Sequence, residues 1–180
     1  MAQKIVWMDL EMTGLDPDKD KIIEIATILT DIQLENPIMG PHLIIHEDQD
    51  RFLQMDDWNQ KQHTKSGLWQ KVLDSQTNCA EAEQKTLEFL KENNTKGCYL
   101  AGNSIWQDRR FLMKHMPKID QYLHYRMLDV STIKILQNFW FKKTKYSKKS
   151  NHRATDDILD SIEELKFYRE HILNEPKSTV

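Results

Sequence analysis

Cysteine is scarce in this sequence of 180 residues, with only Cys79 and Cys98 present. They have neither the spacing nor the companion ligands of a metal site, so we expect reduced, structural thiols. Long apolar runs are also missing, since no segment approaches the roughly 18 apolar residues that a membrane span needs. The N-terminal segment carries acids early and has no signal-peptide pattern. Together these absences predict a cytoplasmic protein that does not enter a membrane.

An excess of positive charge is missing as well. The formal net charge is −3 and the sequence pI is near 6.2. Proteins that bind long nucleic acids usually have strongly basic surfaces, because their affinity comes largely from neutralising many phosphates. We therefore expect any nucleic-acid substrate to be short, or to be held by a few local contacts and metal ions. Long duplex nucleic acid is not an expected partner.

Repeats, low-complexity tracts and internal linkers are absent too, so residues 1–180 are expected to form a single domain with a flexible tail over about 173–180. Strand-like and helix-like segments alternate along the chain. Strands are predicted at 5–10, 21–30, 42–46, 98–102 and 125–128, and helices at 78–91, 107–116, 130–139 and 154–171. Turn residues at 14–18 predict a hairpin between the first two strands. This order indicates an α/β domain with a mixed central sheet flanked by helices.

Two acids stand at the end of the first predicted strand. Asp9 and Glu11 are two residues apart, so both carboxylates project from the same face of the strand. Neighbouring anions repel unless they share a cation. The D-x-E pattern is common by chance, however, and a pair of acids facing water is the simpler interpretation of this pair alone.

Two further acids lie on predicted helices. Asp108 shares a helical face with Phe111 and Leu112, which turns it toward the interior, although an acid in a first turn also stabilises the helix dipole. In the last helix Asp157 flanks the apolar stripe, whereas Asp156 points away from it. The stripe consists of Ala154, Ile158, Ile162, Leu165 and Ile172.

His152 precedes the last helix by two residues. Most loop histidines are merely solvated, but a late histidine close to an inward-facing acid changes the interpretation of the set. Acids at a strand end and on two helices favour hard divalent cations bound through oxygen. An imidazole base beside such ions indicates hydrolytic phosphoryl transfer.

At these residues the sequence resembles the oligoribonucleases, DEDD-type 3′→5′ exonucleases with a histidine in the third motif. The resemblance extends from about residue 6 to 169. It is carried by WMDLEMTGL at 7–15, AGNS through DRRFL at 101–112, HYRMLDVST at 124–132 and HRATDDI at 152–158. The first and third of these segments are the most specific to this family.

The resemblance implies a ribonuclease-H-like fold, a homodimer and two Mg²⁺ or Mn²⁺ ions per active site. Position by position, Asp9, Glu11, Asp108 and Asp157 would bind the metals, and His152 would deprotonate the attacking water. The substrates would be short RNA oligonucleotides and dinucleotides, and the products nucleoside 5′-monophosphates.

The same resemblance suggests how substrate length is sensed. Leu15 matches a leucine that wedges against bases, and Trp58 and His63 match pocket-lining residues. Ser104 and Ser131, with Arg126 of the partner subunit, match a cap over the 5′ phosphate, and Tyr125 of the partner subunit would reach the catalytic site. From the residues alone, Leu15 could be a turn anchor, Tyr125 a core aromatic and Trp58 simple packing.

Two features depart from the family pattern: Trp106 stands where a small residue is expected, and residues 141–150 form a short lysine-rich stretch. Two other functions stay open at this point. One is a DNA-trimming or proofreading-type exonuclease of the same superfamily. The other, from a different class, is a non-catalytic cation-binding module.

Overall fold

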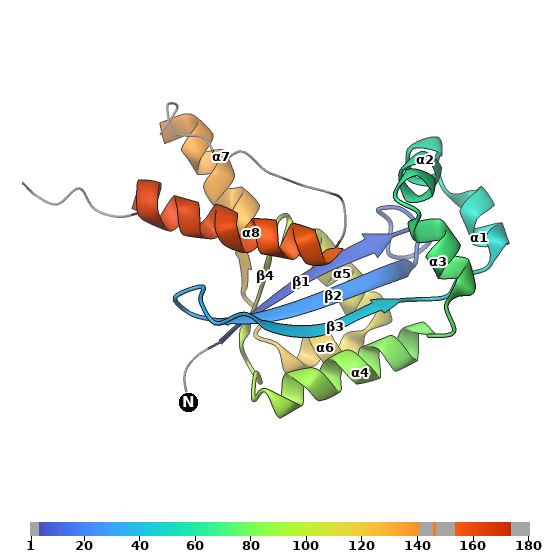
Figure 1. The fold of residues 1–180 in the computed structure, drawn as a ribbon, viewed down its shortest axis with the longest axis horizontal. Coiled ribbons are helices and arrows are strands. Elements are labelled where there is room, and N and C mark those ends of the chain that lie inside the picture. Colours follow the sequence, from blue (N-terminus) through green and yellow to red (C-terminus); the bar gives the residue numbers. More distant parts are fainter. Residues whose placement is uncertain (1–3, 141–145, 147–153, 174–180) are drawn as a thin grey trace, which may run out of the picture.

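A computed structural model describes residues 4–140, Tyr146 and residues 154–173, with the side chains of 172 and 173 left out. Most of the expected tail at 173–180 therefore lies outside the described residues. Helices cover both faces of a central sheet (Figure 1). Among the described helices, none is both long enough and apolar enough to span a bilayer.

The sheet has five strands in the order β3-β2-β1-β4-β5. β1, β2 and β3 are antiparallel neighbours, whereas β4 and β5 run parallel to β1. The strands are β1 (Lys4–Met12), β2 (Ile22–Asp31), β3 (Ile38–Ile44), β4 (Tyr99–Gly102) and β5 (Met127–Asp129). The predicted mixed sheet is confirmed, and β1 lies at its centre.

Alternation along β1 divides the core into two layers. Val6, Met8 and Leu10 face one helical layer, whereas Ile5 and Trp7 face the other. The first layer contains α4 (Cys79–Glu92), α5 (Ile105–His115) and α6 (Pro117–Tyr122), and the second contains α7 (Val130–Trp140) and α8 (Ala154–Tyr168). A π-helical turn, Arg169–Leu173, follows α8. A central strand covered on both faces explains the nearly continuous apolar sequence of β1.

Three short helices were not predicted: α1 (Gln49–Gln54), α2 (Asp57–Lys65) and α3 (Leu68–Asp74). They form a group at the end of the sheet toward which β1 runs (Figure 1). In α2 the buried residues are Asn59 and His63, so the helix has no apolar stripe for a sequence pattern to reveal. α6 was not predicted either. Pro117 ends the predicted helix before it, but it also begins α6, because its fixed φ suits the first helical position.

α4 begins with a capping box, a reciprocal pair of hydrogen bonds between Asn78 and Glu81. The Asn78 side chain accepts a hydrogen bond from the Glu81 amide at 2.9 Å, and the Glu81 carboxylate accepts one from the Asn78 amide at 3.0 Å. Asn78→Ala should lower the free energy of unfolding by about 1 kcal/mol, measured by urea denaturation. Lys85→Ala on the exposed face of α4 is the control and should change it by less than about 0.5 kcal/mol. Equal losses would show that the cap contributes nothing specific.

Candidate metal centre

The end of β1 presents two carboxylates to the layer of α8. Asp9 and Glu11 follow Ile5 and Trp7 in the alternation, so they point to the face that packs against Ala154 and its helix. Both acids are partly exposed at this end of β1. The strand thus places the two acids at the rim of the core.

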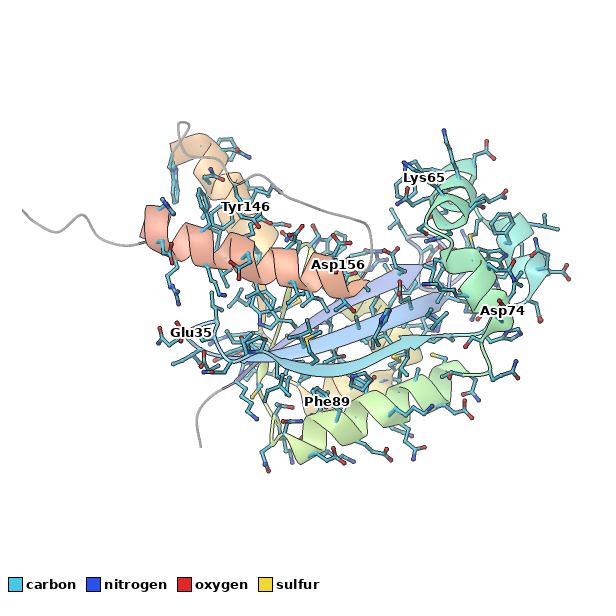
Figure 2. All side chains as sticks on the ribbon, in the orientation of Figure 1. Glu35, Lys65, Asp74, Phe89, Tyr146 and Asp156 are labelled. Carbon is cyan, nitrogen blue, oxygen red and sulfur yellow. The ribbon has the colours of Figure 1, made fainter. Side chains whose placement is uncertain are left out.

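Asp157 comes to the same place from α8. It lies in the first turn of that helix, directly before the buried Ile158. One carboxylate oxygen from each of Asp9, Glu11 and Asp157 can be chosen so that all three lie within 4.8 Å of one another. Oxygen ligands at roughly 2.0–2.6 Å from one cation have such separations. The preceding residue, Asp156, also lies in the first turn of α8 (Figure 2). It is not one of the three converging acids.

The electrostatics of the group favour a cation. The pKa of Glu11 is raised from its ordinary 4.5 to about 8, chiefly by burial and then by the charges of Glu24, Asp157 and Asp108. A divalent cation would offset this repulsion and keep the carboxylates ionised. The donors are all carboxylate oxygens, which fits hard ions such as Mg²⁺, Mn²⁺ or Ca²⁺.

Asp108 approaches from the opposite layer. It is buried in the first turn of α5, and its Oδ1 accepts a hydrogen bond from the Leu10 amide at 2.9 Å. Burial raises its pKa to about 7, although this hydrogen bond acts in the other direction. The side chain therefore does face inward. It is close enough to influence Glu11 but is not one of the three converging carboxylates, so its metal-binding role stays a prediction.

Leu15 and Trp58 are exposed large apolar side chains, at 72% and 69% of their full accessibility. Leu15 follows β1, and its carbonyl accepts a hydrogen bond from Gln107 of α5 at 2.8 Å. It also lines a pocket of about 810 Å³ together with Arg51 and Arg110. Both apolar side chains are thus available for contact.

His63 is placed differently from the other predicted substrate residues. Its ring is buried in α2, and its Nε2 donates to the Met12 carbonyl at 2.9 Å. Burial lowers the pKa of His63, which favours the neutral ring at neutral pH. The imidazole therefore ties α2 to the last residue of β1, immediately after the two acids.

Ser104 and Ser131 lie together at the ends of β4 and β5, with their hydroxyl oxygens 3.2 Å apart. Tyr125 and Arg126 are exposed just before β5, where the guanidinium lies 5.3 Å from the centre of the tyrosine ring. Trp106 is exposed beside Arg110, 5.8 Å from the guanidinium carbon to the ring centre.

His152 lies outside the described residues, as does the lysine-rich stretch apart from Tyr146. Three buried acids were not singled out from the sequence: Glu24, Glu83 and Glu164. Glu24 pairs with Glu11 across β1 and β2 and contacts His42, and Glu164 is fully buried in α8. A charged residue within the apolar run of β2 was a signal for the first of them.

Comparison with known proteins shows the family to which this chain belongs. Residues 6–165 match the family described as "Exonuclease" (RNase_T). An oligoribonuclease of Pseudomonas syringae pv. syringae is 51% identical over 95% of this chain and 97% of the relative. One of Francisella tularensis subsp. novicida is 49% identical over 96% of this chain and 98% of the relative. The chain belongs to the oligoribonuclease family.

Solved structures show the same fold for this oligoribonuclease-family chain. An exonuclease I from Methylocaldum szegediense superposes with a TM-score of 0.71 at 17% identity over 96% of this chain. The chain spans 41% of that enzyme, and also 41% of the Escherichia coli exonuclease I solved with an oligonucleotide, where the TM-score is 0.69 at 12% identity. Pop2p of S. pombe, in a Mg²⁺- and Mn²⁺-bound form, gives 0.67 at 15% identity over 94% of this chain and 84% of its own. The predicted ribonuclease-H-like fold is confirmed.

The raised pKa of Glu11 predicts how the metal-free protein responds to pH. The unfolded chain releases this proton near pH 4.5 but the folded chain holds it to about pH 8, so folding stability is lost as pH rises through this window. Glu11→Gln should flatten that slope. In EDTA its melting temperature should exceed the wild-type value at about pH 8, and by much less at about pH 5. Glu88→Gln, on the exposed face of α4, is the control. A difference that is the same at both pH values would contradict the assignment.

Proposed function

We propose that the protein is a 3′→5′ exoribonuclease that hydrolyses short oligoribonucleotides, above all dinucleotides, to nucleoside 5′-monophosphates, the final step of RNA degradation. One observation carries this proposal: Asp9, Glu11 and Asp157 converge within 4.8 Å in a chain that is 51% identical to an oligoribonuclease. The acidic pI agrees with a short substrate, because few phosphates need to be neutralised. The cytoplasm, where short RNA accumulates during decay, is the proposed location.

The metal centre is proposed to hold two ions, Mg²⁺ or Mn²⁺. Asp9, Glu11 and Asp157 would bind through the oxygens that already converge, and Asp108 would complete the set from α5. When bound, such ions lower the pKa of water and stabilise negative charge at the scissile phosphate. The hydrogen bond from the Leu10 amide holds the Asp108 carboxylate beside the end of β1.

His152 is proposed as the general base that takes the proton of the attacking water. It precedes Asp157, a residue of the metal centre, by five residues in the sequence. Tyr125 of the partner subunit would reach the same site in a homodimer. Exposed apolar side chains of α7 support dimerisation, since Ile135, Phe139 and Trp140 would otherwise all face water.

Substrate length would be limited by contacts at both ends of a dinucleotide. Leu15 and Trp58 offer exposed apolar surfaces to the bases, and His63 would line the same pocket while it braces β1. At the other end, Ser104 and Ser131 with Arg126 of the partner subunit would form a cap that binds the 5′ phosphate. Such a cap would increase the affinity for a substrate with a terminal 5′ phosphate and would leave no room for a further nucleotide.

The cap can be tested by substrate length. A 5′-phosphorylated ribodinucleotide should be hydrolysed much faster than a longer oligoribonucleotide of the same composition, because the longer chain extends past Ser104. The initial rate of 5′-monophosphate release, followed by chromatography, measures both. Comparable rates on the two substrates would reject the cap. Faster hydrolysis of the matching deoxyribodinucleotide would support the DNA-trimming alternative instead.

The metal centre can be tested by two neighbouring residues of α8. Asp157→Asn should lower the rate of dinucleotide hydrolysis by about a hundredfold or more, because it removes a charged ligand of the ions. Asp156→Asn makes the same chemical change one residue earlier, outside the converging group, and should leave the rate within about twofold. Circular dichroism should show that both variants are folded. Full activity of Asp157→Asn would favour a non-catalytic cation-binding module.

A further inference from the structure

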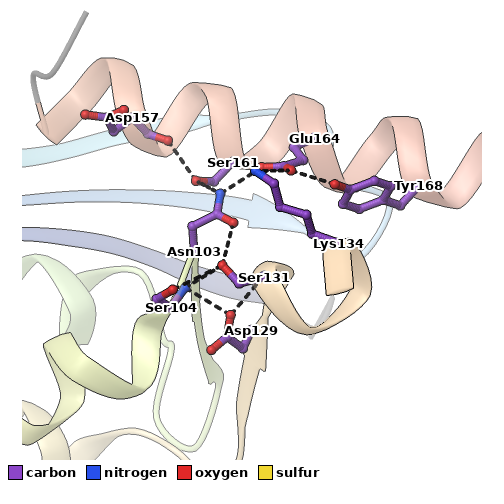
Figure 3. A network of polar contacts seen from close by, with 9 residues as sticks. All are labelled: Asn103, Ser104, Asp129, Ser131, Lys134, Asp157, Ser161, Glu164 and Tyr168. Carbon is purple, nitrogen blue, oxygen red and sulfur yellow. Dashed lines mark hydrogen bonds and ion pairs between the residues drawn. The ribbon is translucent and has the colours of Figure 1, made fainter. Parts of the chain in front are cut away.

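A chain of hydrogen bonds links α8 to the turn after β4 (Figure 3). It begins at Glu164, whose side chain is fully buried. Its carboxylate accepts from the Tyr168 hydroxyl at 2.6 Å and from Nδ2 of Asn103 at 3.0 Å, and the Lys134 ammonium lies 3.3 Å away. A carboxylate can only accept hydrogen bonds, so each group that faces it must present a proton. Lys134 compensates for the buried charge.

The orientation of the Asn103 amide follows from its two partners in α8. Its Nδ2 faces Glu164 and also donates to the Ser161 hydroxyl oxygen at 2.8 Å. Ser161 donates its own proton to the Asp157 carbonyl at 2.8 Å, so toward Asn103 it can only accept. Both contacts require the NH₂ group of Asn103 to face α8. Its amide oxygen must then face Ser131.

This orientation determines which serine is left as a donor. The Ser131 hydroxyl donates to Oδ1 of Asn103 at 3.0 Å and accepts from the Ser104 amide at 3.0 Å. The amides of Ser104 and Ser131 also donate to Asp129, at 3.0 and 2.9 Å. Because the Ser131 hydroxyl has given its proton to Asn103, Ser104 is the donor in the 3.2 Å contact between the two hydroxyls. Ser104 is exposed, so it can turn this proton toward a ligand.

The backbone at Ser104 is held in an unusual conformation. Its φ is +52°, in the left-handed region that costs a residue with a side chain about 1 kcal/mol or more. The two acceptors of its amide, Asp129 and Ser131, hold the turn in place. The hydroxyl is therefore fixed in position by one set of contacts, and its donor role is fixed by the chain that starts at Glu164.

We propose that Glu164 is a positioning residue for substrate recognition: it directs the hydrogen bonds through Asn103 and Ser131 so that Ser104 presents its proton to the 5′ phosphate of the substrate. The proposal rests on the proposed function, which places that phosphate at the serines. The same Asn103 amide is tied through Ser161 to the backbone of Asp157. One buried carboxylate thereby connects recognition of the 5′ end with the helix that carries a metal-binding acid.

Glu164→Gln is the direct test. The new amide faces donors on both sides, because Tyr168 and Lys134 lie at one of its ends and the Asn103 NH₂ group at the other. If the oxygen of the new amide faces Lys134, the NH₂ group of that amide faces the NH₂ group of Asn103. Two facing donors repel each other, which favours rotation of the Asn103 amide. Ser131 would then have to accept from Asn103 and would compete with Ser104 as a donor.

The readout is the preference for a terminal phosphate. Dissociation constants are measured in EDTA, so that no hydrolysis occurs, for one ribodinucleotide with and without its 5′ phosphate. Glu164→Gln should reduce the ratio of the two constants by about tenfold, as expected for the loss of one hydrogen bond to a charged group. Affinity for the unphosphorylated dinucleotide should change little. The ratio of kcat/KM values in Mg²⁺ should fall in parallel.

Two controls separate positioning from stability. Glu83→Gln changes a buried glutamate of α4 on the other face of the sheet, where the carboxylate accepts from the Lys118 amide at 2.7 Å. Tyr168→Phe removes one donor to Glu164 but leaves the carboxylate facing Asn103. Both should lower the melting temperature and leave the phosphate preference unchanged.

The possible results are distinct. A wild-type preference that survives in Glu164→Gln would overturn the positioning role alone. No preference in the wild-type protein would reject the serine cap of the proposed function and the positioning role with it. If Glu164→Gln does not fold, Asn103→Ala breaks the same chain from its partly exposed side and should give the same loss of preference. An unchanged ratio in that variant would equally reject the proposal.

Discussion

Repulsion among carboxylates at the end of β1 is the constraint on which this site depends. Asp9, Glu11 and Asp157 come together where burial already disfavours charge, and Asp108 and Glu24 add to the negative potential. Without a counter-charge Glu11 holds its proton to unusually high pH, because burial and the neighbouring carboxylates raise its pKa to about 8. A divalent cation, as proposed for this site, would replace this repulsion with attraction to a shared positive charge.

The rest of the structure holds the acids against that repulsion. β1 is the central strand: β4 pairs with its residues 5–7, and β2 pairs with it as far as Met12, past both acids. The two helical layers supply Asp157 from α8 and Asp108 from α5, and α2 braces the last residue of β1 through His63. Glu164 adds a second buried carboxylate on α8, here neutralised by Lys134 rather than left for a cation. Asp157 and Glu164, both on α8, are therefore proposed to act at different ends of the substrate site.

Much of this arrangement could be predicted from local patterns. Period-two alternation predicts that Asp9 and Glu11 lie on one face of β1. Helical periodicity predicts that Asp157 faces the sheet and that Asp156 does not, and Asp157 is the one in the converging group. These patterns gave no signal where the buried side chains are polar or charged. α1 and α2 bury no apolar side chain, so they show no apolar stripe. Glu164 accepts a hydrogen bond from Tyr168 one turn later, but its other partners, Lys134 and Asn103, lie 30 and 61 residues away in sequence, too far for any local pattern to reveal. Roles in substrate binding came from family resemblance, because exposed side chains such as Trp58 carry no signature of their own.

The central claim is that these acids share divalent ions beside the scissile phosphate. The most direct test is a crystal soaked with Mn²⁺ and a 5′-phosphorylated dinucleotide, with the ions located by anomalous scattering. We predict one ion bound by Asp9, Glu11 and Asp157, a second ion next to Asp108, and the 5′ phosphate at Ser104. Ions found elsewhere, with these carboxylates left protonated and unligated, would contradict it.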